Sequence, residues 1–456
     1  MTCKAFFLAD GFFAAHGHPS FAPRIRRYRS CIKPATAAIE LMMNPAKVLF
    51  VWDDKDISNA KLGAPEGGNI GIGGTDFLFG SIPHELGKRQ AGKIAVLHQT
   101  PSNQLSPWVE DIVVPPGGTI LATLKEVAGR FDLIVARPGD QLVQMMDVLP
   151  PSARVIAWSH NHSRGPMLKW LGLEPRIAAV VNVGREQMLL TRFSESYAKS
   201  TWIDNPVYAP PSGDEAVRTC RAVYMGALVP GKGFLHLAKL WPRIRQAVPQ
   251  AELDVIGSAD LYGAASKSDQ QYLQKIHQHL GHDAAKSGVR FHGKLGSEKY
   301  AVLHKALVGL PNPTGFTETS CLSALEMSSC GLAIVAPQRW GFCDTVHPQH
   351  SGILAPDDET YVRSVVSLLS NPASTQKLGH SGKAWVAHHF SHEKISGEWQ
   401  TLFQSLLTGR PLRQPEPTQP TGVYPHGFLY RHNVLGPYSQ ALRDVADKLV
   451  GWRLKQ

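Results

Sequence analysis

Cysteine is scarce in this chain, and the few cysteines present have no regular spacing. Only six occur among 456 residues, and no two of them form a C-x-x-C pair. The six are Cys3, Cys31, Cys220, Cys321, Cys330 and Cys343. Scattered cysteines in a long chain argue against a disulfide framework and against a structural zinc site. They suit a reducing compartment, so we expect a cytoplasmic protein.

Long apolar runs are also absent. The sequence has no stretch of about 18 or more uninterrupted apolar residues, which excludes an ordinary membrane-spanning helix. The run Ala5–Ala15 has some of the character of a secretory signal, but Asp10 interrupts it and only Lys4 precedes it. We therefore expect neither a membrane span nor secretion.

Basic residues exceed acidic ones without forming dense runs. The 47 lysines and arginines against 37 acidic residues give a net charge of +10. This excess favours anionic partners such as nucleotide diphosphates or anionic lipid headgroups. The sequence has no dense basic run with interleaved aromatic residues and no zinc-finger or RNA-recognition signature, so nucleic acid is not expected as a partner.

Apolar strand candidates alternate with helical patterns through most of the chain. The first set of candidates is 47–52, 94–97, 133–136, 154–158 and 178–183. The second set lies near 221–226, 252–257, 289–293, 307–311 and 332–336. Such alternation predicts βαβ units, in which helices cover both faces of a parallel sheet. We predict an α/β protein with two doubly wound, Rossmann-like domains.

Composition sets the boundaries of four predicted segments. Residues 1–46 form an N-terminal extension that is a disordered tail, a targeting segment, or sequence upstream of the true start codon at Met42 or Met43, and the last of these is favoured. The two domains occupy 47–212 and 213–410. Residues 411–456 form a proline-rich linker and a C-terminal helix. The apolar face of that helix either docks on the protein or makes peripheral contact with an anionic membrane.

The strongest candidate site is a pair of acidic residues around a short predicted helix. Glu318 and Glu326 stand eight positions apart, and the apolar strand 332–336 follows them. This layout places one carboxylate on a loop, a helix start beside it, and the second carboxylate two turns further on. A helix start offers unpaired N–H groups and partial positive charge to a phosphate, while carboxylates accept hydrogen bonds from sugar hydroxyls. A nucleotide sugar fits both demands.

Lys232 lies in a glycine-rich turn at 226–234, directly after a predicted strand. The turn matches a phosphate-binding P-loop except at its last position, where Gly233 replaces the Ser or Thr that would hold magnesium. Lys232 is expected to contact phosphate whether the turn binds a nucleotide sugar or is a P-loop of a nucleotide hydrolase. No essential metal is expected. Because ligands bind beyond the carboxyl ends of parallel strands, and both Lys232 and Glu318 follow strands, we expect the active site in the cleft between the domains.

Four segments of this region resemble, in the expected order, motifs of the retaining glycosyltransferases of family 4, which have the GT-B fold. They are the G-R-L-x-x-x-K-G turn at 226–233, V-x-F-x-G at 289–293, E-x7-E at 318–326 and G-x-L-x-x-x-D at 352–358. The resemblance covers roughly residues 220 to 405. It implies that residues 47–212 form the acceptor-side domain and residues 213–410 the domain that binds the nucleotide sugar.

The resemblance also implies roles for individual residues. It assigns Glu318 to the transferred sugar, Glu326 to the ribose hydroxyls and Lys232 to the donor diphosphate. His160 corresponds to a donor-site histidine, with His162 as the alternative. The further donor-binding residues are Gly231, Gly233, Thr319, Ser320, Cys321 and Leu322, together with Gly73 and Gly74 of an N-terminal glycine loop. The alternative for this glycine loop is a plain flexible loop without a role in donor binding. The D-x-D pattern at 54–56 follows the first strand and is predicted to be a turn, not a metal motif.

Two positions depart from the family pattern. Ala227 replaces an arginine that shares the neutralisation of the diphosphate with Lys232, and Ser320-Cys321 replace the usual Phe-Gly. A cation that stabilises the leaving group is worth several kcal/mol. Either Lys232 therefore works alone, or Lys294 or Arg339 assists, or activity is weak.

The sequence thus predicts a glycosyltransferase that moves a hexose from a UDP- or GDP-sugar to an acceptor hydroxyl with retention of configuration. The acceptor is expected to be a saccharide or lipid-linked, and no cofactor is expected besides the donor. Two alternatives stay open. One is a nucleotide-sugar-binding protein with little or no transfer activity, and the other is a nucleotide-sugar epimerase or hydrolase on the same fold.

Overall fold

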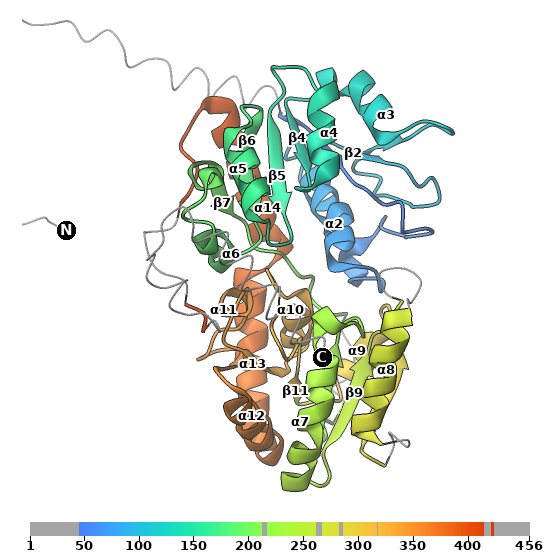
Figure 1. Ribbon diagram of the computed structural model, residues 1–456, viewed down its shortest axis with the longest axis vertical. Coiled ribbons are helices and arrows are strands. Elements are labelled where there is room, and N and C mark those ends of the chain that lie inside the picture. The colour runs from blue at the N-terminus through green and yellow to red at the C-terminus, as the bar shows by residue number, and fades with distance from the viewer. Residues whose placement is uncertain are drawn as a thin grey trace, which may run out of the picture. The chain divides into compact units, whose positions relative to one another are not determined.

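Two parallel sheets organise the protein (Figure 1). The computed structural model describes residues 45–211, 217–260, 267–281, 286–316, 318–414 and 421–423. Nearly all of the predicted N-terminal extension and the whole predicted helix at 439–454 lie outside these residues, so the predictions made for them stay predictions.

The first sheet has seven strands in the order β3-β2-β1-β4-β5-β6-β7, and every neighbouring pair is parallel. The strands are β1 (Lys47–Val51), β2 (Lys93–His98), β3 (Glu110–Val113), β4 (Leu133–Ala136), β5 (Val155–Ser159), β6 (Ile177–Asn182) and β7 (Ser200–Trp202). The helices between them are α2 (Gly74–Lys88), α3 (Ile120–Val127), α4 (Asp140–Val148), α5 (Gly165–Leu173) and α6 (Arg185–Leu190). The strand order reverses between β1 and β4, as in a doubly wound domain.

The second sheet repeats this plan with six parallel strands in the order β10-β9-β8-β11-β12-β13. The strands are β8 (Arg221–Met225), β9 (Glu252–Ile256), β10 (Val289–Gly293), β11 (Val308–Gly309), β12 (Ala333–Pro337) and β13 (Gly352–Ala355). The helices of this half and the last described helix are α7 (Phe234–Ala247), α8 (Lys267–Leu280), α9 (Lys299–Leu303), α10 (Leu322–Ser329), α11 (Phe342–Thr345), α12 (Asp358–Ser370), α13 (Pro372–His389) and α14 (His392–Thr408). The predicted fold class, two doubly wound α/β domains, is confirmed.

The central strands are apolar throughout because both of their faces are buried. In β1, Val48 and Phe50 belong to one core cluster, whereas Leu49 and Val51 belong to the cluster on the opposite face. Strands of parallel sheets covered by helices on both sides have this continuous apolar character. All ten strands predicted from apolar runs are present. Three strands, β3, β7 and β13, were not predicted. The sequence of the edge strand β3, EDIV, is largely exposed and carries two acidic residues.

Helix α14 follows the second sheet in sequence but packs on the first (Figure 1). Its Ile395, Trp399 and Phe403 are buried in the same cluster as Phe50 of β1, and the rings of Trp399 and Trp158 lie 5.1 Å apart. The predicted C-terminal domain, residues 213–410, includes α14 by sequence, whereas the apolar face of α14 completes the N-terminal core. It thereby holds the two halves of the chain together.

The described residues include no helix that is both long enough and apolar enough to span a bilayer.

His392, the first residue of α14, couples stability to pH. Its ring is buried, stacks on Tyr208 at 3.6 Å, and has no hydrogen-bond partner for either nitrogen among the described residues. Burial, reinforced by the nearby His84, lowers the pKa of His392 to about 3. An unfolded histidine has a pKa of about 6.5, so between these values the unfolded state binds the extra proton.

We therefore predict that His392→Phe makes the protein less sensitive to acid. In the wild-type protein His392 should cost about 1.4 kcal/mol of stability for each pH unit below about 6.5, because folding must keep the ring neutral. The phenylalanine ring keeps the stack without titrating. Denaturant unfolding at pH 7, 6 and 5 measures this, and the difference between variant and wild type at each pH removes the contributions of other groups. An equal loss of stability in both proteins would contradict the prediction.

Candidate active site

A cleft of about 770 Å³ lies between the two halves, at the carboxyl ends of their strands. Each sheet contributes the two loops at the point where its strand order reverses. Asp53 and Arg137 follow β1 and β4, while Lys232 and Glu318 follow β8 and β11, and all four line the cleft. These reversal points are where doubly wound sheets bind ligands.

The structure brings together nearly every residue that the sequence analysis placed in the site. The cleft is lined by Glu318, Glu326, Lys232, His160, Gly231, Thr319, Ser320, Cys321, Leu322, Gly73 and Gly74. Two residues are exceptions: Gly233 and the alternative histidine His162 are not among the lining residues. Gly233 has φ +68°, and a Cβ there would lie 2.8 Å from Thr314, so glycine is required for the backbone turn into α7.

Lys232 and Glu318 form an ion pair. Lys232 Nζ lies 2.6 Å from Glu318 Oε1, which also accepts a hydrogen bond of 2.9 Å from Asn312 Nδ2. The Glu318 side chain is 7% exposed and that of Lys232 is 32% exposed, so the carboxylate is the shielded partner. The amide of Asn312 donates to Gly231 O as well, at 3.2 Å, which fixes the lysine turn against the Glu318 loop.

Glu326 is paired with a second lysine, Lys299. The two side chains meet at 2.9 Å, and Lys299 Nζ also donates to the backbone oxygen of Asn69, 3.1 Å away in the N-terminal half. The side chain of Lys299 is only 3% exposed. Both carboxylates of the predicted E-x7-E element are therefore neutralised by a lysine.

Two helix starts open into the cleft. The N-caps of α2 and α10, Gly73 and Cys321, provide no side-chain hydrogen bond to the first turn. A Cβ on Gly74 would lie 2.7 Å from Leu322 Cδ1, so the two helix starts touch. The buried hydroxyl of Ser320 lines the same cleft and has no partner among the described residues. Uncapped N–H groups, the positive ends of two helices and a free hydroxyl suit an anion.

His160 follows β5 and joins the two halves. Its backbone oxygen accepts a hydrogen bond of 2.5 Å from Thr319 Oγ1. The ring is buried against Trp158, and its Nε2 has no partner in the part of the chain that the structure describes. Burial, with Arg137 nearby, holds the pKa of His160 well below its usual range, so the ring is neutral at pH 7. A neutral ring can donate one hydrogen bond and accept another.

The structure sorts the cations that could replace the missing family arginine. Ala227 has no charged side chain, so this position supplies no cation, and the residue is fully buried. Lys294 is exposed and lines the cleft, whereas Arg339 is not among the lining residues. Arg137 lines the cleft too, and it has no hydrogen bond or salt bridge with any described residue. Lys294 and Arg137 are therefore the cations placed to assist Lys232.

Sequence reasoning missed several cleft residues. Arg137 directly follows a predicted strand, so the rule that located Lys232 and Glu318 could have found it. Asp76 lies in the first turn of α2, where Trp52 Nε1 donates to its Oδ1 at 3.2 Å. Burial raises the pKa of Asp76. Lys299 and Asn312 carried no motif that would have marked them.

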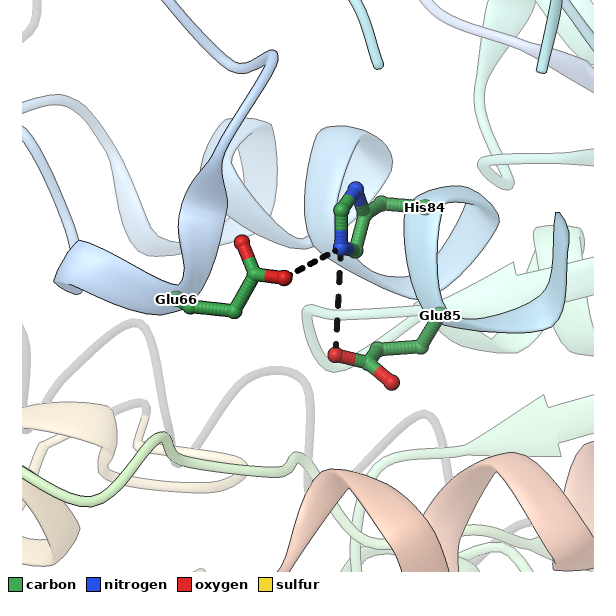
Figure 2. Close-up of side chains that lie close together, drawn as sticks. All are labelled: Glu66, His84 and Glu85. Carbon is green, nitrogen blue, oxygen red and sulfur yellow. Dashed lines mark hydrogen bonds and ion pairs between the residues drawn. The ribbon is translucent and has the colours of Figure 1, made fainter. Parts of the chain in front are cut away.

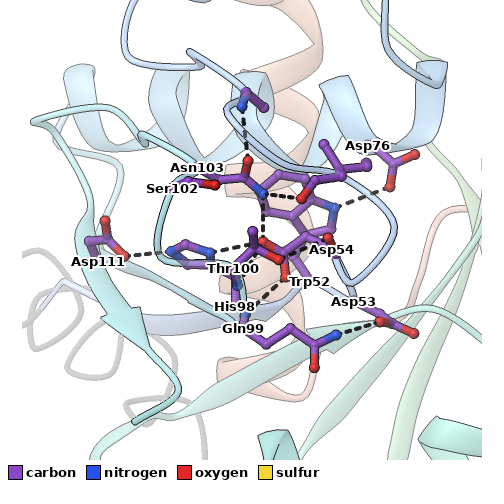
Figure 3. Close-up of polar contacts among 12 residues, drawn as sticks. Trp52, Asp53, Asp54, Asp76, His98, Gln99, Thr100, Ser102, Asn103 and Asp111 are labelled. Carbon is purple, nitrogen blue, oxygen red and sulfur yellow. Dashed lines mark hydrogen bonds and ion pairs between the residues drawn. The ribbon is translucent and has the colours of Figure 1, made fainter. Parts of the chain in front are cut away.

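The D-x-D pattern at 54–56 does not form a metal motif. Asp54 is fully buried and accepts hydrogen bonds from Asn103 Nδ2 at 2.7 Å and from Gln99 N at 2.9 Å, as Figure 3 shows. Burial alone would raise its pKa, but the hydrogen bonds, chiefly that with His98, outweigh burial and lower it. Asp56 is exposed. The Asp54 side chain thus fixes the loop after β2. Its backbone oxygen accepts a hydrogen bond of 2.9 Å from Ile57 N, which closes the turn at 54–57.

In the region covered by the structure, one group of side chains has the spacing of metal ligands. Glu66, His84 and Glu85 place ligand atoms within 4.8 Å of one another (Figure 2). His84 Nε2 lies 2.9 Å from Glu66 Oε1 and Nδ1 lies 2.8 Å from Ser106 Oγ, while Lys88 pairs with Glu66 at 2.6 Å. These partners already satisfy the ring and the carboxylate. The group lies outside the cleft and is a polar network that anchors α2.

The two-sheet architecture is the GT-B fold. Sucrose-phosphate synthase from Thermosynechococcus elongatus superposes with a TM-score of 0.62 at 18% identity, over 80% of this chain and all of that one. Anabaena HepE in complex with UDP and glucose superposes with a TM-score of 0.58 at 14% identity, over 79% of this chain and all of that one. At such identities the likeness shows the fold alone.

Sequence comparisons support the glycosyltransferase class. Residues 219–371 match the family model described as glycosyl transferases group 1. The chain is 24% identical to D-inositol 3-phosphate glycosyltransferase of Streptomyces bingchenggensis over 60% of its length and 57% of that relative. It is 23% identical to GDP-mannose-dependent alpha-(1-6)-phosphatidylinositol monomannoside mannosyltransferase of Mycolicibacterium smegmatis, over 65% of its length and 81% of that relative. The chain therefore matches little more than half of the first relative.

We predict that Lys232→Ala weakens the binding of UDP or GDP by about 10- to 100-fold, the usual worth of a charge-assisted hydrogen bond. The change removes a cation from the cleft and leaves the shielded Glu318 carboxylate with the Asn312 amide as its donor among the described residues. Isothermal titration calorimetry measures the affinity. Lys305→Ala, which removes an exposed lysine that does not line the cleft, is the matched control. An unchanged dissociation constant for Lys232→Ala would remove this residue from the site.

Proposed function

We propose that the protein is a retaining glycosyltransferase that moves a hexose from a UDP- or GDP-sugar to an acceptor hydroxyl. The observation that carries the proposal is the convergence of two lysine-paired carboxylates and two uncapped helix starts in one cleft. The helix starts suit the diphosphate, and the carboxylates suit hydroxylated rings. A nucleotide sugar supplies both kinds of group in one molecule.

In the proposed complex, Glu326 accepts hydrogen bonds from the ribose and Glu318 orients the sugar. The diphosphate lies against the start of α10, where Lys232 stabilises the charge that develops on the leaving group. Lys232 is paired with Glu318 at 2.6 Å before the donor binds, so it contacts the diphosphate by sharing or leaving that carboxylate. The neutral His160 donates a hydrogen bond to the sugar without adding charge.

Retention is proposed to follow front-face substitution. The departing phosphate takes the proton of the acceptor hydroxyl, and the new bond forms on the face that the leaving group vacates. This route needs no carboxylate nucleophile.

Asp76 also lines the cleft from the N-terminal half. Its raised pKa and the hydrogen bond that it accepts from Trp52 suit a group that binds an acceptor hydroxyl.

The acceptor is proposed to be a saccharide or a lipid-linked molecule that enters from the N-terminal half. The names of the two relatives described above include D-inositol 3-phosphate and phosphatidylinositol monomannoside. We accordingly propose a role in glycolipid or polysaccharide synthesis in the cytoplasm, with peripheral contact to an anionic membrane. No cofactor other than the donor is proposed.

A nucleotide-sugar-binding protein with little transfer activity is the second candidate, because the buried Ala227 supplies no cation. A panel of UDP- and GDP-sugars screened for thermal stabilisation identifies the donor under either candidate. A radiolabelled-sugar assay with the stabilising donor then separates transfer to saccharide or lipid acceptors, donor hydrolysis and binding without turnover. Stabilisation by none of these donors would overturn both candidates.

Glu318→Ala should abolish transfer, with a fall in kcat of at least about 100-fold, because an interaction made with the reacting sugar is lost. The protein should stay folded, since the side chain of Lys232 is one-third exposed and can be hydrated. Binding of UDP or GDP should be retained, because the Lys232 cation stays in the cleft. Glu393→Ala, at an exposed glutamate on α14, serves as the control. Undiminished turnover in the Glu318 variant would reject its assigned role.

A further inference from the structure

Lys299, at the start of α9, is a buried cation that contacts both halves of the protein. Its Nζ lies 2.9 Å from Glu326 Oε1 on α10 and 3.1 Å from the backbone oxygen of Asn69 in the N-terminal half. The side chain is 3% exposed and lines the cleft. A lysine is rarely buried this fully unless it is paired, so both contacts belong to one compensated arrangement.

Asn69 organises the glycine loop that leads into α2. Its Oδ1 accepts hydrogen bonds from the backbone N–H groups of Gly71, at 2.9 Å, and Ile72, at 3.0 Å. Its Nδ2 donates to Ile72 O, also at 3.0 Å. The residue that Lys299 holds is therefore the one that fixes the conformation of 69–72. The next residues, Gly73 and Gly74, begin α2 and line the cleft.

The segment before α9 packs on the same loop. A Cβ on Gly68 would lie 2.1 Å from the hydroxyl oxygen of Tyr300, and a Cβ on Gly71 would lie 3.0 Å from Leu295 O. Both glycines have positive φ, so side chains are excluded there by backbone conformation and by space. The loop and the segment from Leu295 to Tyr300 form a close interface, and Lys299 supplies its charged contact.

An ammonium group has three N–H donors, and Lys299 uses two of them on Glu326 and Asn69. Its attraction keeps one carboxylate oxygen of Glu326 in a fixed place. A hydroxyl donor that binds the other oxygen meets a carboxylate that is already oriented, which lowers the entropic cost of binding. Any ligand that stabilises this position of Glu326 also stabilises the Lys299 contact with the glycine loop.

We propose that Lys299 is a positioning residue that couples ribose binding at Glu326 to the order of the glycine loop. The inference rests on the proposed function, in which Glu326 contacts the ribose of the donor. The nucleotide bound to the C-terminal half thereby prepares the N-terminal loop for the sugar. Removing Lys299 weakens nucleotide binding and, separately, breaks this transmission.

Hydrogen–deuterium exchange of the full-length protein tests the coupling. The probes are UMP and GMP, which contain the ribose but lack the sugar that Gly73 and Gly74 are expected to contact. In the wild-type protein the nucleotide should slow exchange of the amides in 68–75. In Lys299→Met, at saturating nucleotide, this slowing should disappear, and the dissociation constant should rise by about 5- to 150-fold, the usual range of a coupling. Lys299→Arg should restore part of both effects.

Lys305→Met is the matched control, because Lys305 is an exposed lysine just after α9 that does not line the cleft. It should behave as the wild type in both measurements. If Lys299→Met does not fold, Glu326→Gln replaces it, since it removes the charge at the other end of the pair. With saturating UMP or GMP, this variant should also show no slowing of exchange in the loop.

The possible failures are distinguishable. A wild-type protein that binds no UMP, GMP, UDP or GDP overturns the proposed function itself. A wild-type protein that binds one of these nucleotides, while Lys299→Met or Glu326→Gln transmits the same protection to 68–75, overturns only the role of Lys299. Exchange of 68–75 in Lys299→Met could also be faster than in the wild type by the same factor with and without nucleotide. The effect of the nucleotide is then intact and the contact is purely structural, so this result overturns the role of Lys299 as well.

Discussion

The ion pair of Lys232 and Glu318 is the contact on which the site depends. A shielded carboxylate without a counter-charge is costly, and a diphosphate would bring further negative charge into the same cleft. The 2.6 Å pair solves the first problem in the free protein. Two helix starts, Lys294 and Arg137 supply positive groups for a diphosphate, although the acidic side chains of Asp53, Asp56, Asp76 and Asp260 also line the cleft. The anion that we propose would therefore bind at the helix starts and their neighbouring cations.

The doubly wound topology explains why these groups meet. Each sheet reverses its strand order once, and the loops at that point diverge, leaving space between them. Because both reversal points open into one cleft, four loops from distant parts of the sequence face each other. Contacts such as Thr319 with the backbone of His160, and Lys299 with Asn69, then tie the loops of one sheet to those of the other.

Much of this arrangement could be read from the sequence. The ten apolar runs became strands because burial on both faces leaves no place for polar residues. Lys232 and Glu318 were placed in the cleft because each lies on a loop that follows such a strand, and the carboxyl ends of parallel strands share one edge. His160 was placed there by its resemblance to a donor-site histidine of the family. The loop at Glu318 and the short helix α10 after it were predicted from the eight-residue spacing of Glu318 and Glu326. The positions of the strands and the local chemistry at their ends depend on residues that are close together in the chain.

Other features were decided only by the tertiary structure. Lys299 is 230 positions from the residue whose backbone it binds, so no local pattern marks it. Helix α14 has an ordinary amphipathic sequence, and only packing shows that it completes the N-terminal core. The sequence by itself determined the strands, the turns and the residues at their ends, since these depend on neighbours along the chain. The pairing of each carboxylate with its lysine depends on how separate elements pack, and only the folded chain fixes that.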